Sequence, residues 1–483
     1  MAITPASQTR AGAVKAALSE NYLDIQNNGW AQQYLPDLME KEAEVFGKRT
    51  ISGFLSQVGA EEAMAADQVI WSEQGRLHLS YKGTVGTHTT STIQLDTDID
   101  DQDVGTTHGV RVGDTVLVAS AALTVQCYVS QINSDTNGDQ NTGSTDFITV
   151  APYSHEHLDD AGFGTNDAVT VLVYGSEYAK GVAGKVGSNE PSFTTFTNKP
   201  IIMKDMYQVS GSDVSQIGWV EVSGEDGQNG YYWYLKAEGD TRSRFADYCE
   251  MSLIESEKAA TESLALSGLV GVDELQGTEG LFAAVESRGH QTSGVTGVNA
   301  ATDLAEFDAI LAEFDKQGAI EENMMFVNRA TSLAMDDMLA SMNSYGAGGT
   351  SYGVFDNSED MALNLGFSGF RRGSYDFYKS DWKYLNDLAT RGGINARNTA
   401  GAIRGVIIPA GTSSVYDESL GKNLVRPFLH TRYRASNTES RKMKTWVTGS
   451  VGAVTSDLDA MTVNFLTERC LVVQGANNFM LMN

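Results

Sequence analysis

One segment with regularly spaced oxygen-bearing side chains is the clearest candidate for chemistry in this sequence. Asp135, Asn137, Asp139 and Asp146 stand at relative positions 1, 3, 5 and 12 of that segment. A calcium ion needs about six to eight oxygen ligands that converge from one turn, and this spacing supplies several of them. Gln140 occupies the position where the sharp turn favours glycine, and strands rather than helices are expected on both sides. The segment predicts either a Ca²⁺ site or a solvated hairpin loop, since Asn, Asp and Gly also favour turns.

A second polar cluster has the sequence His-Glu-His-Leu-Asp-Asp and begins at His155. Strand alternation would place His155 and His157 on one face, as a metal site requires. No third ligand is evident nearby, so a polar turn is the competing interpretation. The sequence contains no HExxH, phosphate-loop or dinucleotide-binding motif. We therefore expect a protein that is not an enzyme and has no resident cofactor apart from the Ca²⁺ just considered.

The three cysteines, Cys127, Cys249 and Cys470, lie far apart and include no CxxC pair. They predict buried small hydrophobic side chains rather than a disulfide framework or a zinc site. The N-terminal residues lack the apolar core of a signal peptide, and no apolar run approaches the length that crosses a bilayer. We expect no membrane partner, and synthesis and assembly in a reducing cytoplasm.

Acidic side chains dominate the composition. There are 62 Asp or Glu residues against 34 Lys or Arg, which gives a formal net charge of −28. A duplex-binding protein relies on Lys and Arg to displace counterions from phosphates. This balance argues against nucleic acid as the primary ligand, although DNA kept away by repulsion can still lie nearby.

Basic side chains gather in two places. One is the Arg371-Arg372 pair, and the other is the segment 422–444, where seven basic residues accompany a single acidic one, Glu439. Nucleic acid is one target for such segments, but the overall charge favours acidic patches on neighbouring subunits. The residues predicted to make inter-subunit contacts are Arg371, Arg372, Arg432, Arg434, Arg441, Lys442 and Lys444.

The first half of the chain changes from helical to strand periodicity. Residues 1–65 contain short helical pieces with too few apolar residues for a core, which predicts an arm that docks elsewhere. From Leu77 the side chains alternate in short strands separated by polar turns. Residues 96–190 contain fifteen acidic and three basic residues. Because open strand edges are a liability, these strands predict a small closed barrel. The strands expected there are Thr92–Leu95, Val110–Val118, Leu123–Ile132, Phe147–Val150 and Ala168–Val173.

The second half predicts longer elements. Residues 231–265 form the longest helical pattern, which would span roughly 50 Å and act as a spine. Residues 300–410 alternate between helix and strand, with one helix ended by Gly318, and indicate a single α/β domain. The closing strands expected after it are Thr445–Val447, Met461–Phe465 and Cys470–Val473.

This order of elements, with three local passages, resembles the major capsid proteins of tailed bacteriophages, which have the HK97-like fold. Asn198–Met203 (NKPIIM) and Tyr207–Ser212 (YQVSGS) resemble the returning strand of that family's extended loop. Val69–His78 (VIWSEQGRLH) is similar to its outgoing strand in large-genome podoviruses, including crAss-like phages. The passages that resemble the closing strands of the peripheral domain are Trp446–Ser450, Asn464–Arg469 and Gly475–Phe479.

The resemblance implies an α+β fold of the HK97-like capsid type, into which a small β-barrel is inserted. The implied regions are an N-terminal arm at 1–65, the outgoing strand of the extended loop at 66–83, the barrel at 84–190, the return strand at 191–222, the spine helix and peripheral domain at 223–295, the axial α/β domain at 296–430 and the closing peripheral strands at 431–483. The barrel departs from the minimal family pattern, so its role as an outer-surface or subunit-contact module is our own inference.

The function that the resemblance implies is that of a major capsid subunit. Such a subunit self-assembles, as pentamers and hexamers, into the icosahedral head of the virion around packaged double-stranded DNA. Its partners would be further copies, a portal and head accessory or decoration proteins, with assembly in the host cytoplasm. The alternative is a calcium-dependent surface-array or adhesin-type binding protein, against which the missing secretion signal argues. The resemblance brings no catalytic residues.

Overall fold

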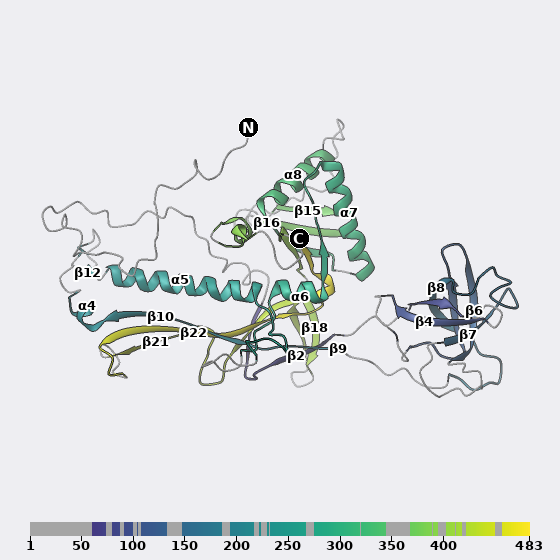
Figure 1. Ribbon diagram of the computed structural model, residues 1–483, viewed down its shortest axis with the longest axis horizontal. Helices are drawn as coiled ribbons and strands as arrows, with labels where there is room; N and C mark the ends of the chain where they lie inside the picture. Colours follow the sequence, from purple (N-terminus) through teal and green to yellow (C-terminus); the bar gives the residue numbers. More distant parts are fainter. Residues whose placement is uncertain are drawn as a thin grey trace. The chain divides into compact units, whose positions relative to one another are not determined.

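The chain forms two compact units in this computed structural model (Figure 1). The main unit comprises Met1–Trp71 and Phe196–Asn483, and the barrel unit comprises Ser72–Thr195. The structure describes residues 60–73, 80–86, 91–99, 104, 108–132, 147–185, 194–216, 222–223, 229–230, 232–266, 275–318, 320–343, 368–388, 390–394, 402–410, 412–417, 422–449 and 456–483.

The barrel unit closes six antiparallel strands on themselves. They are β3 (Ser80–Val85), β4 (Thr92–Asp98), β5 (Asp114–Ala119), β6 (Thr124–Ile132), β7 (Phe147–Pro152) and β8 (Ala168–Ser176). Hydrogen bonding runs in the order β3-β4-β7-β6-β5-β8 and returns to β3, so each strand has a partner on both sides. The closed barrel predicted from short alternating strands is confirmed.

Alternation of side chains fills the barrel interior. Ile93 and Leu95 of β4 point inward and are fully buried, whereas their neighbours on the strand are partly exposed. Gly83 of β3 is needed where β4 bulges past it, because a Cβ at this position would lie 2.0 Å from the carbonyl oxygen of Gln94. The apolar interior of the barrel is thus complete within its own unit.

The first sheet of the main unit is built around β22 (Ala460–Val473). All of β10 (Ile201–Ser210) pairs antiparallel along one edge of β22, from Ala460 to Arg469. β20 (Leu429–Arg434) and β21 (Lys444–Gly449) share the other edge, at opposite ends. β1 (Ala60–Met64) pairs in parallel with β20 and makes the sheet five-stranded.

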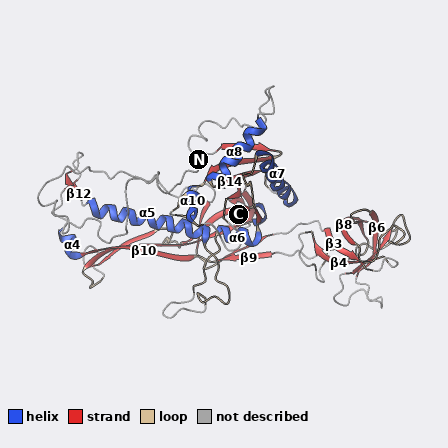
Figure 2. Cartoon of the chain, turned by 45° about the horizontal axis from the view of Figure 1, so that its top comes forward, coloured by secondary structure: helices blue, strands red, loops and turns tan. Residues whose placement is uncertain are grey.

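The spine predicted from the sequence is α5 (Tyr232–Glu255), which lies along one face of this sheet (Figures 1 and 2). Its 24 residues span about 36 Å. Phe245 and Cys249 of the helix pack against Val463 and Phe465 of β22, and the ring centroids of Phe245 and Phe465 are 6.0 Å apart.

The second sheet of the main unit is mixed and six-stranded, in the order β13-β23-β17-β14-β16-β15. Its strands are β13 (His290–Thr292), β14 (Glu322–Val327), β15 (Ser368–Arg372), β16 (Tyr375–Asp381), β17 (Gly405–Pro409) and β23 (Met480–Met482). α7 (Ala300–Gln317) and α8 (Arg329–Asn343) pack on one face through a core that contains Phe307, Phe314 and Met335. The other face meets a second core, to which α6 (Leu281–Arg288) and α10 (Lys383–Asn386) contribute.

Capping residues explain the bounds of α7. The side chain of Asn299 accepts hydrogen bonds from the backbone N–H groups of Ala301 and Thr302. Gly318 ends the helix in the left-handed region, with φ of 63°. The helix end predicted at Gly318 is confirmed.

Smaller elements complete the described chain. They are the strand pairs β2 (Val69–Glu73) with β9 (Thr194–Asn198), β11 (Val222–Ser223) with β12 (Asn229–Gly230) and β18 (Thr412–Asp417) with β19 (Lys422–Pro427), and the short helices α4 (Gly211–Gln216), η4 (Arg391–Gly393) and η5 (Ala476–Asn478).

Four expectations need correction. The spine helix ends at Glu255, ten residues early, because the chain turns away to bridge Lys258 with Gly277. The two closing strands expected at 461–473 are one continuous strand, β22. β5 begins at Asp114 rather than Val110, since Gly113 turns the chain with φ of 95°. The last strand, β23, lies in the mixed sheet and not beside β22.

Candidate assembly surfaces

The calcium loop predicted at Asp135–Asp146 lies outside the described residues. The neighbouring cluster is described: His155 and Glu156 are exposed, and the backbone N–H of His157 donates to Asp160 Oδ2 at 3.2 Å. Among the described residues no three His, Cys, Asp or Glu side chains are grouped so that they could hold a metal ion. None of the described helices is long and apolar enough to cross a membrane.

Arg371 and Arg372 lie on β15, the edge strand of the mixed sheet. Arg372 forms a two-pronged ion pair with Asp308 of α7, with Nη2 and Oδ2 at 2.6 Å. Arg371 Nε lies 3.6 Å from Asp376 Oδ1 on the paired strand. Both arginines therefore have acidic partners within the chain, and their predicted contact with another subunit stays a prediction.

The basic residues of β20 hold β1, the end of the predicted arm, to the sheet. Arg432 Nη2 lies 2.7 Å from Glu62 Oε2, and Arg434 pairs with Asp67 just after β1. Lys442, beyond the following turn, pairs with Glu61. The last strand of the arm, β1, thus docks within its own chain, by parallel strand pairing and three ion pairs, and the expected overlap of the arm with an adjacent subunit stays a prediction.

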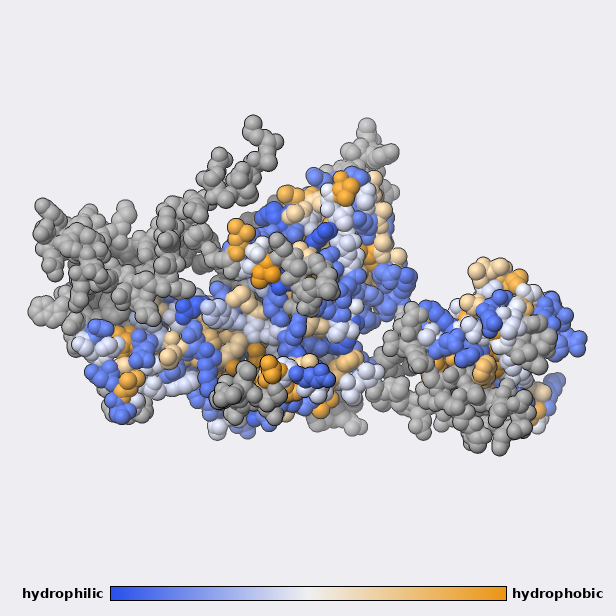
Figure 3. Space-filling model, viewed as in Figure 1, coloured by the Kyte–Doolittle hydropathy of each residue, from blue (hydrophilic) through white to orange (hydrophobic). Residues whose placement is uncertain are grey.

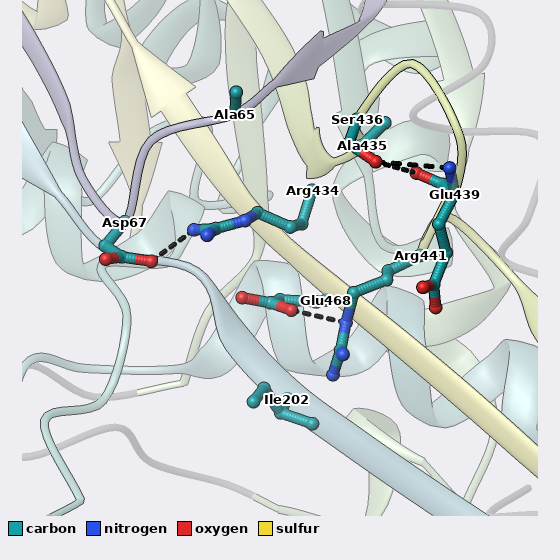
Figure 4. A pocket seen from close by; sticks show the side chains of 9 residues that line it. All are labelled: Ala65, Asp67, Ile202, Arg434, Ala435, Ser436, Glu439, Arg441 and Glu468. Carbon is teal, nitrogen blue, oxygen red and sulfur yellow. Dashed lines mark hydrogen bonds and ion pairs between the residues drawn. The ribbon is translucent and has the colours of Figure 1, made fainter.

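Two further ion pairs fix the turn that joins β20 to β21. Arg441 Nε lies 2.6 Å from Glu468 Oε2 of β22, and Lys444 pairs with Glu439. Figure 4 shows Arg434 and Arg441 beside a hollow that Ile202 of β10 also lines. All seven basic residues predicted to contact other subunits thus have an acidic partner in the same chain.

Asn198, at the junction of β9 and β10, is the centre of a buried polar cluster that the sequence did not single out by chemistry. Its Nδ2 donates to the carbonyl oxygens of Leu471 at 2.7 Å and Glu279 at 3.0 Å. Its Oδ1 accepts from the backbone N–H groups of Lys199 and Glu279 and from the hydroxyl of Thr278. Every hydrogen-bonding position of this amide is used, so the start of β10 has a fixed place on β22.

Aromatic stacking fixes the chain just before this junction. The guanidinium carbon of Arg288, in the last turn of α6, lies 4.5 Å from the ring centroid of Phe196 and 5.6 Å from that of Trp71. Arg288 Nη2 also pairs with Glu279 Oε2 at 2.8 Å. Arg288 therefore holds Trp71 of β2 and Phe196 of β9 together, and the extended loop that the resemblance implies here stays a prediction.

The face of the five-stranded sheet that is turned away from α5 carries exposed apolar side chains. Along β10, Met203 faces the helix, so Ile202 and Met206 face the other way, with 54% and 58% of their surface exposed. Strand register places the half-buried Trp446 of β21 on the same face as Met206. Lys444 Nζ lies 5.7 Å from the centroid of that indole ring. We call Ile202, Met206 and Trp446 the apolar strip. On the face of the molecule shown in Figure 3, apolar side chains gather in small groups.

Burial shapes the titration of groups between α5 and the sheet. Arg469 is largely buried, which lowers its pKa, while Glu250 of α5 acts in the opposite direction. Arg469 Nη2 donates to the carbonyl oxygen of Lys442 at 2.7 Å. Burial raises the pKa of the Cys249 thiol to about 11. Cys249 thus packs between α5 and the sheet, whereas the hydrogen bonds of Arg469 stay within the sheet and the turn before β21.

Comparison with known proteins found no family model that matches this sequence and no matching curated protein. Solved structures give weak similarities. "Microbacterium phage Oxtober96" has 8% identity and a TM-score of 0.38, with 95% of this chain and 99% of that chain covered. "Mycobacterium phage Adephagia" has 10% identity and a TM-score of 0.35, with 95% and 98% covered. "Capsid structure of the Cyanophage P-SCSP1u" has 9% identity and a TM-score of 0.32, with 64% and 80% covered. At these scores the likeness does not establish a shared fold.

Proposed function

We propose that this chain is a structural protein, the major subunit of the icosahedral head of a tailed bacteriophage. The proposal rests on the resemblance of Val69–His78, Asn198–Ser212 and the closing strands to that family, and on the geometry of the main unit. Copies would tile as pentamers and hexamers into the wall of the virion, assembled in the host cytoplasm. Many modest contacts per copy would sum to a shell that resists the pressure of packaged double-stranded DNA.

The observation that carries the proposal is the one-sided covering of the five-stranded sheet. α5 covers one face, and the apolar strip leaves large side chains exposed on the other. Exposed apolar groups rimmed by polar residues mark sites of protein association. The arm and extended loop of neighbouring copies, which would lap over adjacent subunits, would supply the neighbour that this face lacks.

The partners of the shell follow from the same proposal. A portal and head accessory or decoration proteins would join the wall, and the genome would lie inside without sequence-specific contact. The net charge of −28 would keep the DNA from adhering to the wall. The chain would carry out no reaction.

Assembly of the purified protein tests the proposal. We expect sedimentation velocity and negative-stain microscopy to show capsomers and closed particles. The double variant I202E/M206E places two carboxylates on the apolar strip and should give folded subunits that do not close into particles. The double variant I99E/V112E adds two carboxylates to the barrel unit, where Ile99 and Val112 are 38% and 37% exposed, and is the charge-matched control that should assemble normally.

Two outcomes would count against the proposal. One is a wild-type protein that stays monomeric at every concentration, and the other is a double variant that assembles as well as the wild type. Removal of residues 1–30 tests the arm separately, since we expect a folded protein that makes no closed particles. Normal shells from that truncation would contradict the arm's role alone.

Removal of metal ions distinguishes the proposed capsid function from the calcium-dependent alternative. We propose that chelation with EDTA leaves particles intact unless the loop Asp135–Asp146 joins subunits through Ca²⁺. A surface array or adhesin should instead dissociate or release its ligand. Turbidity and light scattering before and after chelation, with Ca²⁺ added back, give the answer.

A further inference from the structure

The outer surface of the barrel unit carries a group of exposed tyrosines. Tyr153, Tyr174 and Tyr178 have 51%, 52% and 37% of their surface exposed. Tyrosine combines a large apolar ring with a polar hydroxyl, which is why it is enriched where proteins bind partners. The barrel core is complete without these rings, so they are not needed for folding. The shell proposal assigns them no role either.

Hydrogen bonding and strand register bring Tyr153 and Tyr174 to one side of the barrel. The backbone N–H of Tyr153, just after β7, donates to the carbonyl oxygen of Gln126 of β6, and Tyr174 and Tyr128 both act on its hydroxyl. Thr115 of β5 pairs with Tyr128 of β6 on one side and with Gly175 of β8 on the other. Tyr174 is the extra residue of the bulge between Gly175 and Val173. β5, β6 and β8 are consecutive around the barrel, so their outward side chains form one continuous surface.

Glu177 lies among the rings. Tyr153 donates its hydroxyl hydrogen to Glu177 Oε2 at 2.6 Å, and this bond raises the pKa of Tyr153 to about 12, with burial and the neighbouring tyrosines adding to the effect. The backbone N–H of Glu177 donates to the carbonyl oxygen of Gly113. The ring of Tyr178 packs on Gly113, where a Cβ would lie 2.8 Å from it. The Glu177 carboxylate is therefore held against the exposed ring of Tyr153, and the backbone of Glu177 is held at Gly113, on which the Tyr178 ring packs.

Exposed apolar side chains stand near these rings in the sequence. Leu172 of β8, two residues before Tyr174, is 37% exposed, and Val182, four residues after Tyr178, is 62% exposed. We call Tyr153, Leu172, Tyr174, Glu177, Tyr178 and Val182 the tyrosine surface.

The net charge of the barrel unit indicates which kind of partner it can bind. Ser72–Thr195 contains sixteen Asp or Glu residues and five Lys or Arg. A duplex nucleic acid would be repelled. A second copy is a poor match too, since the chain has a net charge of −28 and its basic strands pair with their own acids. A cationic side chain is attracted to the face of an aromatic ring and to a carboxylate. The exposed tyrosines and Glu177, on a negatively charged unit, therefore suit a cationic partner.

We propose that the tyrosine surface binds a basic polypeptide segment of another protein. Arg or Lys side chains would lie over the rings of Tyr174 and Tyr178 and pair with Glu177, while aliphatic parts of the segment contact Leu172 and Val182. The surface belongs to the barrel unit alone, so it can be tested whether or not the chain assembles into shells.

The test is fluorescence anisotropy of the full-length protein with a fluorescein-labelled peptide of alternating Arg and Gly. Binding should weaken with salt, and a peptide of alternating Glu and Gly should not bind. Tyr174→Phe keeps an aromatic face and should bind like the wild type. Tyr174→Leu keeps only the apolar bulk and should raise Kd by about two- to five-fold. Lys180→Gln removes a nearby exposed cation and should tighten binding.

A charge-matched control shows whether the site or only the overall charge matters. Asp96→Asn removes one negative charge from β4, which lies across the barrel from β5, and should weaken binding less than Glu177→Gln does. Equal effects of these two variants, or an unchanged Kd for Tyr174→Leu, would overturn the proposal. It also fails if a neutral oligosaccharide binds, with loss in Tyr174→Leu, while the Arg-Gly peptide does not.

Discussion

Single residues decide where the main unit is rigid, and Asn198 is the clearest case. One amide makes five hydrogen bonds, one to the adjacent Lys199 and four to two distant segments, Thr278–Glu279 and Leu471. Its side chain is 1% exposed, so water cannot replace these partners. The resemblance pointed to the Asn198-Lys-Pro passage as a strand signature, and the structure supplies the physical reason for the asparagine.

Replacing Asn198 by Ala should lower the free energy of unfolding by about 3 kcal/mol, because several buried groups would lose their partners at once. Asn198→Asp should also destabilise, since a carboxylate would face the carbonyl oxygen of Leu471. Asn464→Ala is the control: this half-buried asparagine makes two bonds, and its loss should cost about 1 kcal/mol. Equal urea midpoints for Asn198→Ala and Asn464→Ala would contradict the assignment.

The three thiols give a pH prediction. Burial raises the pKa of Cys127 and Cys470 to about 12 and that of Cys249 to about 11. Above the ordinary pKa near 9 the unfolded chain releases these protons while the folded chain keeps them, so stability should fall as pH rises.

Cys470→Val should reduce the slope of stability against pH above 9 by about 1.4 kcal/mol per pH unit, the contribution of one proton. Urea titrations at several alkaline pH values measure this slope. The native thiols should also resist iodoacetamide at pH 8 and react once the chain is unfolded. Rapid alkylation of the folded protein would show that the thiols are accessible.

Sequence could identify the basic residues of the candidate surfaces but not their partners. Arg372 pairs with Asp308, 64 positions away, and Arg434 pairs with Asp67, 367 positions away. Such pairs depend on the tertiary fold, which residue spacing does not reveal. For the same reason Asn198 and Arg288 were not predicted as anchoring residues, although the cysteines were correctly expected to be buried.

At the scale of elements, the sequence predicted the ends of a helix correctly where neighbouring residues, such as caps, determine them. Asn299 and Gly318 cap α7, and both signals are readable in sequence. The end of α5 was missed because the bridge between Lys258 and Gly277 is a contact between distant segments. β22 was predicted as two strands separated by polar residues that include Glu468 and Arg469, although β10 pairs with both of them and β20 pairs with Arg469.

The docking of β1 should depend on its ion pairs. Pairs this exposed are worth about 0.2–1 kcal/mol each, so the double variant E61Q/E62Q should loosen the strand without unfolding the sheet. We expect faster amide hydrogen exchange in Ala60–Met64 and in its partner β20. High salt should accelerate exchange of the wild type in the same strands, because it screens the ion pairs. Glu439→Gln, which breaks a pair within the β20–β21 turn, should leave exchange in β1 unchanged. Unaltered exchange in E61Q/E62Q would mean that backbone pairing alone holds the strand.

At the scale of the whole molecule, the sequence separated the barrel from its surroundings because composition and periodicity both change there. The closed barrel is confirmed, and the compact unit spans Ser72–Thr195. The arrangement of the two main-unit sheets was less accessible, because β23 at the end of the chain lies between β13 and β17 in the mixed sheet. Pairing between strands so distant along the chain leaves no local trace in sequence.

Two compact units with separate apolar cores should unfold in two transitions. Ile148 is fully buried in the barrel core, and Phe307 is fully buried beneath α7 in the main unit. Ile148→Ala should lower only the barrel transition, and Phe307→Ala only the main-unit transition, each by more than about 5 °C, because such cavities cost about 2–5 kcal/mol. Calorimetry of unassembled protein, with hydrogen exchange to assign each transition, measures both. If either variant shifts both transitions equally, the chain unfolds as one cooperative body, and the barrel does not act as the independent module that its proposed partner binding assumes.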